Sequence, residues 1–288
     1  MSDGIAVIDK PAGWTSHDVV AKARGVLGTR KVGHSGTLDP DATGVLVLGI
    51  GRATRLLRFL TALPKSYEAE IVLGSETDTL DSTGRVTARH EMAGVTGAEA
   101  RRAAASLTGD ILQVPPMVSA VRVGGRRLHQ LAREGVEVER EPRPVTVHRF
   151  EVAPVPRGEG VLQAEVDCSS GTYVRVLAAD LGRALGGGAH LRNLRRIAVG
   201  GFGLAEAHPV ESPVVLPMAR AVEHLDGVRV GAAVAADVTH GRVLDRDRLG
   251  AAGAGPWAVH DADGCLLAVY EPFRTGAKPS VVVASAAS

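Results

Sequence analysis

Residues Val45 to Ile50 form an apolar run that directly follows a turn-rich segment, residues 33–44, with the sequence GHSGTLDPDATG. An apolar run of this length bounded by turn residues is typical of a buried strand. A loop that leads into a buried strand is held by the core behind it, so it is a favourable place for functional side chains. The pattern therefore predicts a buried strand with a candidate functional loop immediately before it.

Four other segments have the periodicity or the end signals of helices. Two of them open on pairs that resemble a capping box, Thr15-x-x-Asp18 and Thr96-x-x-Glu99. A third has an apolar face over residues 174–185 and is followed by three glycines, and a shorter helix is expected over residues 52–60.

Strands are expected at residues 67–73, 145–152 and 162–168, where the apolar residues follow strand patterns. Since strands and helices do not alternate regularly along the chain, we expect an α+β fold rather than a doubly wound parallel sheet. After about Leu225 the sequence breaks into short strand-like pieces, with a hairpin expected at residues 257–270. We therefore expect two domains, residues 1–225 and a small β domain at residues 226–288.

Composition excludes several classes of protein. The chain has 33 Lys and Arg against 32 Asp and Glu, so its net charge of +1 does not indicate nucleic acid, and any basic surface must be local. Cys168 and Cys265 are far apart and the ten histidines are scattered, which argues against a disulfide scaffold and against a metal site. No nucleotide-binding glycine motif, signal peptide or membrane span is present, so we expect a cytoplasmic protein without a bound cofactor.

The turn around Asp39 has two interpretations. Asp-Pro commonly opens a turn, and Gly36 and Gly44 give the backbone freedom, so turn chemistry alone favours a structural role. The alternative is a catalytic carboxylate presented by the loop, and the rest of the sequence favours this second interpretation.

The segment from Gly33 to Leu46 resembles the signature of the TruB family of tRNA pseudouridine synthases. Further blocks resemble the family in the same order along the chain, over about residues 5–200. These blocks are DKPAGWTS at 9–16, KSYEA at 65–69, TDT at 77–79 with Asp81 and Gly84, QVPP at 113–116, CSSGTYVR at 168–175, and GAHL at 188–191 with Leu194, Arg195 and Arg196. Residues 226–288 resemble more weakly the family's PUA-like RNA-binding barrel.

The resemblance implies a pseudouridine synthase fold, which is a mixed and mainly antiparallel sheet flanked by helices, followed by the PUA-like β-barrel. It also implies the reaction: the N1–C1′ bond of a uridine breaks, the uracil turns, and C5 is joined to C1′. Because no group is lost and no redox change occurs, the reaction needs neither a cofactor nor a metal. The implied substrate is the T-arm stem-loop of tRNA, with the T-loop uridine at tRNA position 55 as its target.

The resemblance also assigns roles to single residues. Asp39 matches the catalytic carboxylate, which acts as nucleophile or stabilises a cationic sugar, and Arg175 matches the arginine that pairs with it. Tyr67 matches a catalytic residue that is also the platform for the flipped-out base. The other matches are the substrate-binding residues His34, Tyr173 and Leu194 and the supporting residues Lys10 and Pro11. Without the resemblance, each of these residues would be assigned to a turn, a core or a surface.

Three arginine clusters have two interpretations, as solvated surface or as phosphate contacts. They are residues 52, 55 and 58, residues 122, 126, 127 and 133, and residues 192, 195 and 196. Two alternative functions stay open at this point: a guide-RNA-dependent pseudouridine synthase, and a tRNA-binding folding chaperone with secondary or no catalysis. We expect a monomer with no obligatory protein partner and no membrane contact.

Overall fold

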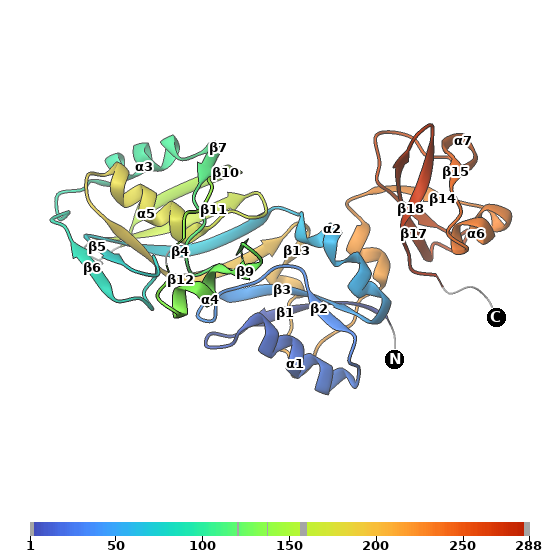
Figure 1. Cartoon of the computed structure of the whole chain (residues 1–288), viewed down its shortest axis with the longest axis horizontal. Helices are drawn as coiled ribbons and strands as arrows, with labels where there is room; N and C mark the ends of the chain where they lie inside the picture. Colours follow the sequence, from blue (N-terminus) through green and yellow to red (C-terminus); the bar gives the residue numbers. More distant parts are fainter. Residues whose placement is uncertain (1–2, 120, 137, 156–159, 285–288) are drawn as a thin grey trace. The chain divides into compact units, whose positions relative to one another are not determined.

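The computed structural model describes residues 3–119, 121–136, 138–155 and 160–284. The chain divides into two compact units, and most of their helices and strands are labelled in Figure 1. The first unit contains residues 1–40, 44–62 and 201–288, and the second contains residues 41–43 and 63–200.

The N-terminal part of the first unit is built on the strand that the apolar run predicts, β3 (Thr43–Ile50). This strand pairs antiparallel with β1 (Gly4–Lys10) and with β2 (Val32–His34). Helix α1 (Ser16–Leu27) packs its apolar side into the core of these strands. Its ends are the predicted ones, because Thr15 and Asp18 form a capping box and Gly28 ends the helix in the left-handed conformation.

The helix expected over residues 52–60 is present only in part. Residues Gly51–Leu56 form a 3-10 helix, η1, and only Leu57–Thr61 form the α-helix α2. The amide of Arg52 donates to Oδ1 of Asp3 at 2.9 Å, and the Thr54 hydroxyl donates to the Gly51 carbonyl at 2.7 Å. The 3-10 winding of η1 thus accompanies a tertiary contact with the N-terminal segment. The helical periodicity of the sequence does not reveal this contact.

The C-terminal part of the first unit contains a small five-stranded sheet, built from the short strands expected after Leu225. Its sheet has the strand order β14–β16–β17–β18–β15. The bounds are β14 (Asp226–Arg229), β15 (Leu244–Asp245), β16 (Trp257–His260), β17 (Leu266–Phe273) and β18 (Gly276–Val282), with helices α6 (Ala232–Thr239) and α7 (Arg246–Leu249). The predicted hairpin is β16 and β17, and it supplies the buried Trp257 and Tyr270 to the core of this part.

Residues 202–222 run between these two parts with little regular structure. They contain β13 (Phe202–Gly203) and the 3-10 helices η2 (Leu204–Glu206) and η3 (Met218–Val222). Two isolated bridges, from Ile5 to Leu216 and from Ile8 to His208, attach this segment to β1.

The second unit is built on an antiparallel sheet with the strand order β12–β4–β11–β10–β7. The bounds are β4 (Lys65–Leu73), β7 (Gly109–Gln113), β10 (Arg143–Pro154), β11 (Val161–Cys168) and β12 (Ala189–Val199). Three of the predicted strands, at residues 67–73, 162–168 and 145–152, therefore lie next to one another as β4, β11 and β10. With both helices and antiparallel strands in no regular order, the α+β prediction is confirmed.

Helices α3 (Gly97–Ser106) and α5 (Val174–Ala184) pack against β10 and β12 and contact each other. Thr96 and Glu99 form the predicted capping box of α3. The remaining elements of this unit are the ribbon β5 (Ser75–Thr77) with β6 (Val86–Arg89), the ribbon β8 (Arg122–Val123) with β9 (Arg126–Arg127), and helix α4 (Leu128–Arg133). No helix among the described residues is long and apolar enough to span a bilayer.

Alternate residues of β4 are buried, and one of them is a lysine. Lys65 is only 7% exposed, and its Nζ donates to the Leu63 carbonyl at 2.6 Å. Burial, and secondly the nearby Arg196 guanidinium, lower the pKa of Lys65 to about 8.

Lys65 should therefore give the protein a pH-dependent stability. Between pH 8 and 10 the unfolded chain keeps a proton on Lys65 that the folded chain has lost, so the cost of burying the charged ammonium falls and the free energy of unfolding increases as the pH rises. We expect the free energy of unfolding of the wild type, relative to Lys65→Met, to increase over that window in urea titrations. Lys22→Met, at an exposed position, is the control. If the free energy of unfolding of the wild type relative to each variant did not change with pH over this window, the expectation would be contradicted.

Candidate active site

The loop that carries Asp39 joins β2 to β3, and backbone hydrogen bonds fix it on both sides of Asp39. Before it, the Leu38 amide donates to Oγ of Ser16 at 2.9 Å, and the Leu38 side chain is buried. After it, the Pro40 carbonyl accepts from Nζ of Lys10 at 2.8 Å and from the Gly13 amide at 3.0 Å. The carboxylate of a partly exposed Asp39 is thus presented from a rigid backbone, as a catalytic group requires.

Lys10 is the centre of this support. Its side chain is fully buried, and Nζ donates to the carbonyls of Pro11 at 2.9 Å, Trp14 at 2.6 Å and Pro40 at 2.8 Å. These bonds join the KPxGxTS-like block to the Asp39 loop, so the supporting role that the resemblance implies for Lys10 agrees with the geometry. Pro11 is exposed and contributes its carbonyl.

Replacing Lys10 by Met should loosen the loop. The three carbonyls lose a charged donor at a buried position, where water does not readily take its place. We therefore expect the free energy of unfolding to fall by about 3 kcal/mol. We also expect turnover to fall, because the backbone on one side of Asp39 is no longer held. Urea denaturation and activity assays test this, with Lys22→Met as control, and an unchanged stability would show that the three bonds contribute nothing.

His34 is the last residue of β2, and its ring is oriented by its neighbours. Nδ1 accepts from the Gly36 amide at 3.3 Å, and the ring lies edge-on to that of His17 at 5.4 Å between centroids. Accepting at Nδ1 leaves Nε2 as the position that carries the proton in the neutral ring. His34 is therefore a positioned side chain in the same loop region as Asp39.

In the second unit, Arg175 lies in the first turn of α5 and is only 4% exposed. Its Nη1 donates to the Thr79 carbonyl at 2.9 Å, and its Nη2 donates to the Val118 carbonyl at 2.8 Å. Nη1 also lies 3.5 Å from Oδ2 of Asp81, so the guanidinium is paired within this unit. A buried arginine held at three points has a fixed orientation.

Asp81 was not among the residues to which the sequence analysis gave a role, although it lies in a matching block. Its Oδ1 accepts from the hydroxyls of Thr79 at 2.7 Å and Thr83 at 2.6 Å, while Oδ2 faces Arg175. The signal that could have revealed it is the acidic residue two positions after TDT, because neighbouring threonine hydroxyls can donate to a carboxylate and fix its orientation.

Tyr173 precedes α5 and is fixed through its backbone. Its amide donates to Oε1 of Gln113 at 2.9 Å, and its carbonyl accepts from Nε2 of the same side chain at 3.4 Å. Gln113 is buried and is the first residue of the QVPP block, so this block holds the start of the helix that carries Arg175. Gln113 is a second residue that sequence reasoning left without a role.

Tyr67 and Leu194 lie on the neighbouring strands β4 and β12. Tyr67 is on the buried face of β4 and pairs in register with Val166 and Arg196. Between Arg192 and Arg195 the register of β12 shifts by one residue against β4, and Leu194 lies in this bulge. Bulges re-aim side chains, so Leu194 departs from the regular alternation of its strand.

The expected site residues thus form two ordered groups. Residues Lys10, Pro11, His34 and Asp39 belong to the first unit, and Tyr67, Tyr173, Arg175 and Leu194 belong to the second. Within each group, the matching sequence blocks contact one another.

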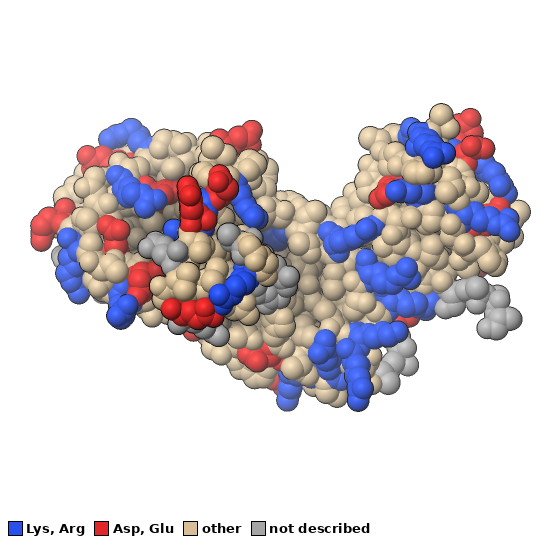
Figure 2. Space-filling model, in the orientation of Figure 1, with Lys and Arg blue, Asp and Glu red and all other residues tan. Residues whose placement is uncertain are grey.

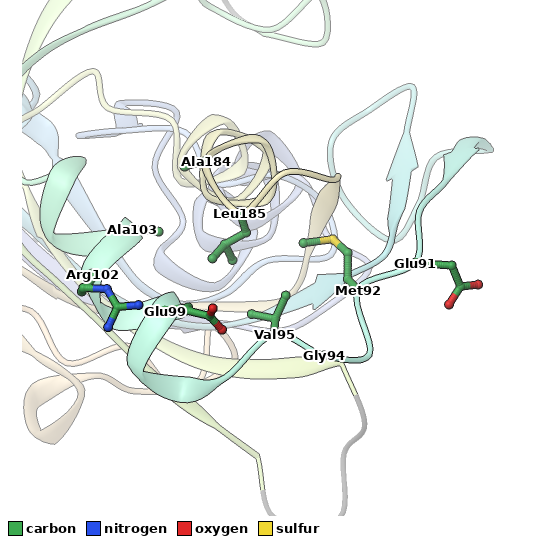
Figure 3. A pocket seen from close by; sticks show the side chains of 9 residues that line it. All are labelled: Glu91, Met92, Gly94, Val95, Glu99, Arg102, Ala103, Ala184 and Leu185. Carbon is green, nitrogen blue, oxygen red and sulfur yellow. The ribbon is translucent and has the colours of Figure 1, made fainter.

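A cavity of about 510 Å³ lies in the second unit, away from these residues. It is lined by residues of the segment 91–99, of α3 and of the C-terminal end of α5, opposite the turn that holds Arg175. Figure 3 shows Met92, Val95 and Leu185 around its apolar part and the charged Glu99 and Arg102 to one side. None of the expected site residues lines it. The described residues also contain no group of three or more His, Cys, Asp or Glu side chains that could hold a metal.

Comparison with known families decides the classification. A sequence model described as TruB family pseudouridylate synthase, N-terminal domain, matches residues 24–174, and one described as tRNA pseudouridylate synthase B C-terminal domain matches residues 175–223. The chain belongs to the TruB family. The resemblance seen in the sequence is thereby confirmed, and the fold is the α+β pseudouridine synthase fold with a PUA-like C-terminal part.

Relatives in the TruB family match nearly the whole chain. The tRNA pseudouridine synthase B of Mycobacterium sp. strain KMS is 48% identical over 97% of this chain and 95% of its own length. That of Thermobifida fusca strain YX is 46% identical over 99% of both chains. Among solved structures, the crystal structure of a Cbf5–Nop10–Gar1 complex has a TM-score of 0.77 at 26% identity and covers 98% of this chain and 85% of that chain.

Proposed function

We propose that this protein is a tRNA pseudouridine synthase that isomerises the T-loop uridine at tRNA position 55. The observation that carries the proposal is the 46% to 48% identity, over almost the full chain, to proteins named tRNA pseudouridine synthase B. The substrate is the T-arm stem-loop of tRNA, and the place of action is the cytoplasm, where tRNA is. Residues 1–225 form the catalytic domain and residues 226–288 the PUA-like RNA-binding domain.

In the proposed mechanism Asp39 acts at C1′ of the target uridine. Its carboxylate attacks C1′, or stabilises the cationic sugar, while the N1–C1′ bond breaks. The uracil turns and C5 joins C1′, after which the C5 proton is lost and N1 gains a proton, so no atom is lost overall. The rigid backbone around Asp39 supports this role because a nucleophile must be held in position before it reacts.

The other site residues have roles around this step. Arg175 pairs with Asp39 and keeps it ionised, and the buried contacts of Arg175 with Thr79, Val118 and Asp81 support a fixed guanidinium. Tyr67 stacks on the flipped-out base and assists proton removal from C5. His34, Tyr173 and Leu194 bind the flipped-out nucleotide.

We further propose that the protein works as a monomer without a guide RNA or an obligatory protein partner. The solved structure of a Cbf5–Nop10–Gar1 complex is similar at 26% identity, whereas the relatives named tRNA pseudouridine synthase B reach 48%. The higher identity favours the standalone enzyme over the guide-dependent one.

Carbodiimide labelling followed by reverse transcription tests the proposed function. The purified protein alone, with an unmodified tRNA transcript, should produce one new stop at the T-loop uridine, and a transcript with cytidine at that position should produce none. Stops elsewhere would refute the target assignment. No stop at all, with tRNA refolding intact, would favour a folding chaperone.

A further inference from the structure

The first unit contains an unusual local concentration of positive charge. Residues 19–34 and 44–62 hold seven Lys and Arg and no Asp or Glu, although the whole chain has a net charge of only +1. Six of these residues form what we call the basic strip: Arg24, Arg30, Lys31, Arg52, Arg55 and Arg58. Figure 2 shows Lys and Arg side chains gathered over this part of the molecule.

These residues are separated along the sequence, but the fold brings them together. The Arg24 guanidinium donates from Nη2 to the Val32 carbonyl at 3.0 Å, which places the end of α1 beside the start of β2. The Gly51 amide donates to the Lys31 carbonyl at 2.7 Å, which places the start of β2 beside η1. The strip therefore runs continuously from α1 across β2 to η1 and α2.

At its other end the strip reaches the C-terminal sheet. Arg52 donates from Nη1 to the Val283 carbonyl at 2.8 Å, and Arg55 donates from Nη1 to the Val282 carbonyl at 2.6 Å. Arg58 donates to the Ser280 hydroxyl. These arginines were expected to be either solvated surface or phosphate contacts, and the structure shows in addition that they attach β18 to η1 and α2.

These contacts orient the guanidinium groups without neutralising most of their charge. A guanidinium has five N–H donors, and a carbonyl or hydroxyl partner uses one of them while the positive charge persists. Within the part of the chain that the structure describes, Arg52 is the member of the strip that forms an ion pair, and its partner is Asp3. The arginines at 24, 52, 55 and 58 are thus oriented donors, and the exposed Arg30 and Lys31 add two positive charges beside them.

We propose that the basic strip binds the phosphate backbone of a base-paired part of the tRNA outside the T-arm. This inference rests on the proposed function, since that function supplies the polyanionic ligand. Guanidinium groups match phosphate oxygens geometrically, and a row of them on one surface follows a nucleic acid backbone without reading its sequence. The contact would add affinity for intact tRNA without touching the reacting uridine.

The double variant Arg30→Gln/Lys31→Gln tests the proposal. Among the described residues, no hydrogen bond or ion pair engages these two side chains, and both are exposed, so the fold should not change. We expect kcat/KM for intact tRNA to fall about 10-fold and the slope of log Kd against log salt to decrease by about 2, since two phosphate contacts are lost. With the isolated T-arm stem-loop, kcat/KM should stay within about twofold of the wild type.

The matched control is Arg85→Gln/Arg183→Gln, because each of these exposed arginines is paired with an acid, Asp78 or Asp180. This control variant should change neither kcat/KM nor Kd for either RNA. If the test variant lost kcat/KM equally on both RNAs, or on neither RNA, the proposal would be overturned. An unchanged kcat/KM on both RNAs would indicate that the strip binds an acidic protein partner instead. The Kd of the test variant for intact tRNA tests the basic strip independently of turnover. If the wild type turned over neither RNA, the proposed function would be refuted, and this binding measurement would still test the strip.

Discussion

Replacing Asp39 by Asn should reduce turnover by about 10³-fold or more while tRNA binding stays within about threefold of the wild type. The amide has nearly the shape of the carboxylate but carries no charge, so it can neither attack C1′ nor stabilise a cationic sugar. The loop should keep its structure, because Lys10, Gly13 and Ser16 hold the backbone beside Asp39. Single-turnover kinetics and filter binding measure the two quantities separately.

Asp41→Asn is the matched control for this variant. Asp41 is an exposed carboxylate in the same loop, two residues further along the chain. Its replacement removes the same charge from nearly the same place, so a general electrostatic effect on RNA binding would affect both variants alike. Comparable losses of turnover in the two variants would contradict a specific role for Asp39.

Replacing Arg175 by Lys should reduce turnover by about 10²-fold or more, with a smaller effect on binding. Lysine keeps the charge but cannot satisfy the Thr79 carbonyl, the Val118 carbonyl and the Asp81 carboxylate in the way that the guanidinium does. In the proposed mechanism, this change displaces the charge that pairs with Asp39. Asp81→Asn should change turnover in the same direction and by less, since it removes one of the three contacts.

Arg183→Lys in the last turn of α5 is the control for Arg175→Lys. Arg183 is exposed and forms an ion pair with Asp180 three residues before it, so its replacement should leave turnover unchanged. Thermal unfolding separates stability from catalysis in both variants. If Arg175→Lys lowered the unfolding temperature but retained full turnover, Arg175 would be a structural residue and not part of the site.

The parts of this fold that the sequence predicts correctly are those with local signals. The capping boxes at Thr15 and Thr96, the left-handed Gly28 and the hairpin at residues 257–270 depend on residues close in sequence, and all are present. The 3-10 helix η1 was not predicted, because it accompanies a bond from Arg52 to Asp3, 49 residues away in sequence.

The same distinction holds for the candidate site. The blocks around Asp39 and Arg175 indicate their residues directly, and these assignments stay predictions. The partners that support them, such as Asp81 for Arg175 and Gln113 for Tyr173, come from distant segments and carry no spacing rule. One surface assignment needs correction, since Arg196 is only 2% exposed and belongs to the buried face of the sheet rather than to a solvated one. The side chains of Arg122, Arg127 and Arg133 lie outside the described residues.

The most direct test of the central claim is tritium release from a T-arm stem-loop labelled at C5 of uridine, with wild type and Asp39→Asn compared in the presence of a metal chelator. Forming the C5–C1′ bond must expel the hydrogen from C5, so release reports the isomerisation itself. The account predicts release by the wild type and at most about 10⁻³ of that rate by the variant. Equal release by both proteins, or none by the wild type under conditions in which it binds the RNA, would contradict it.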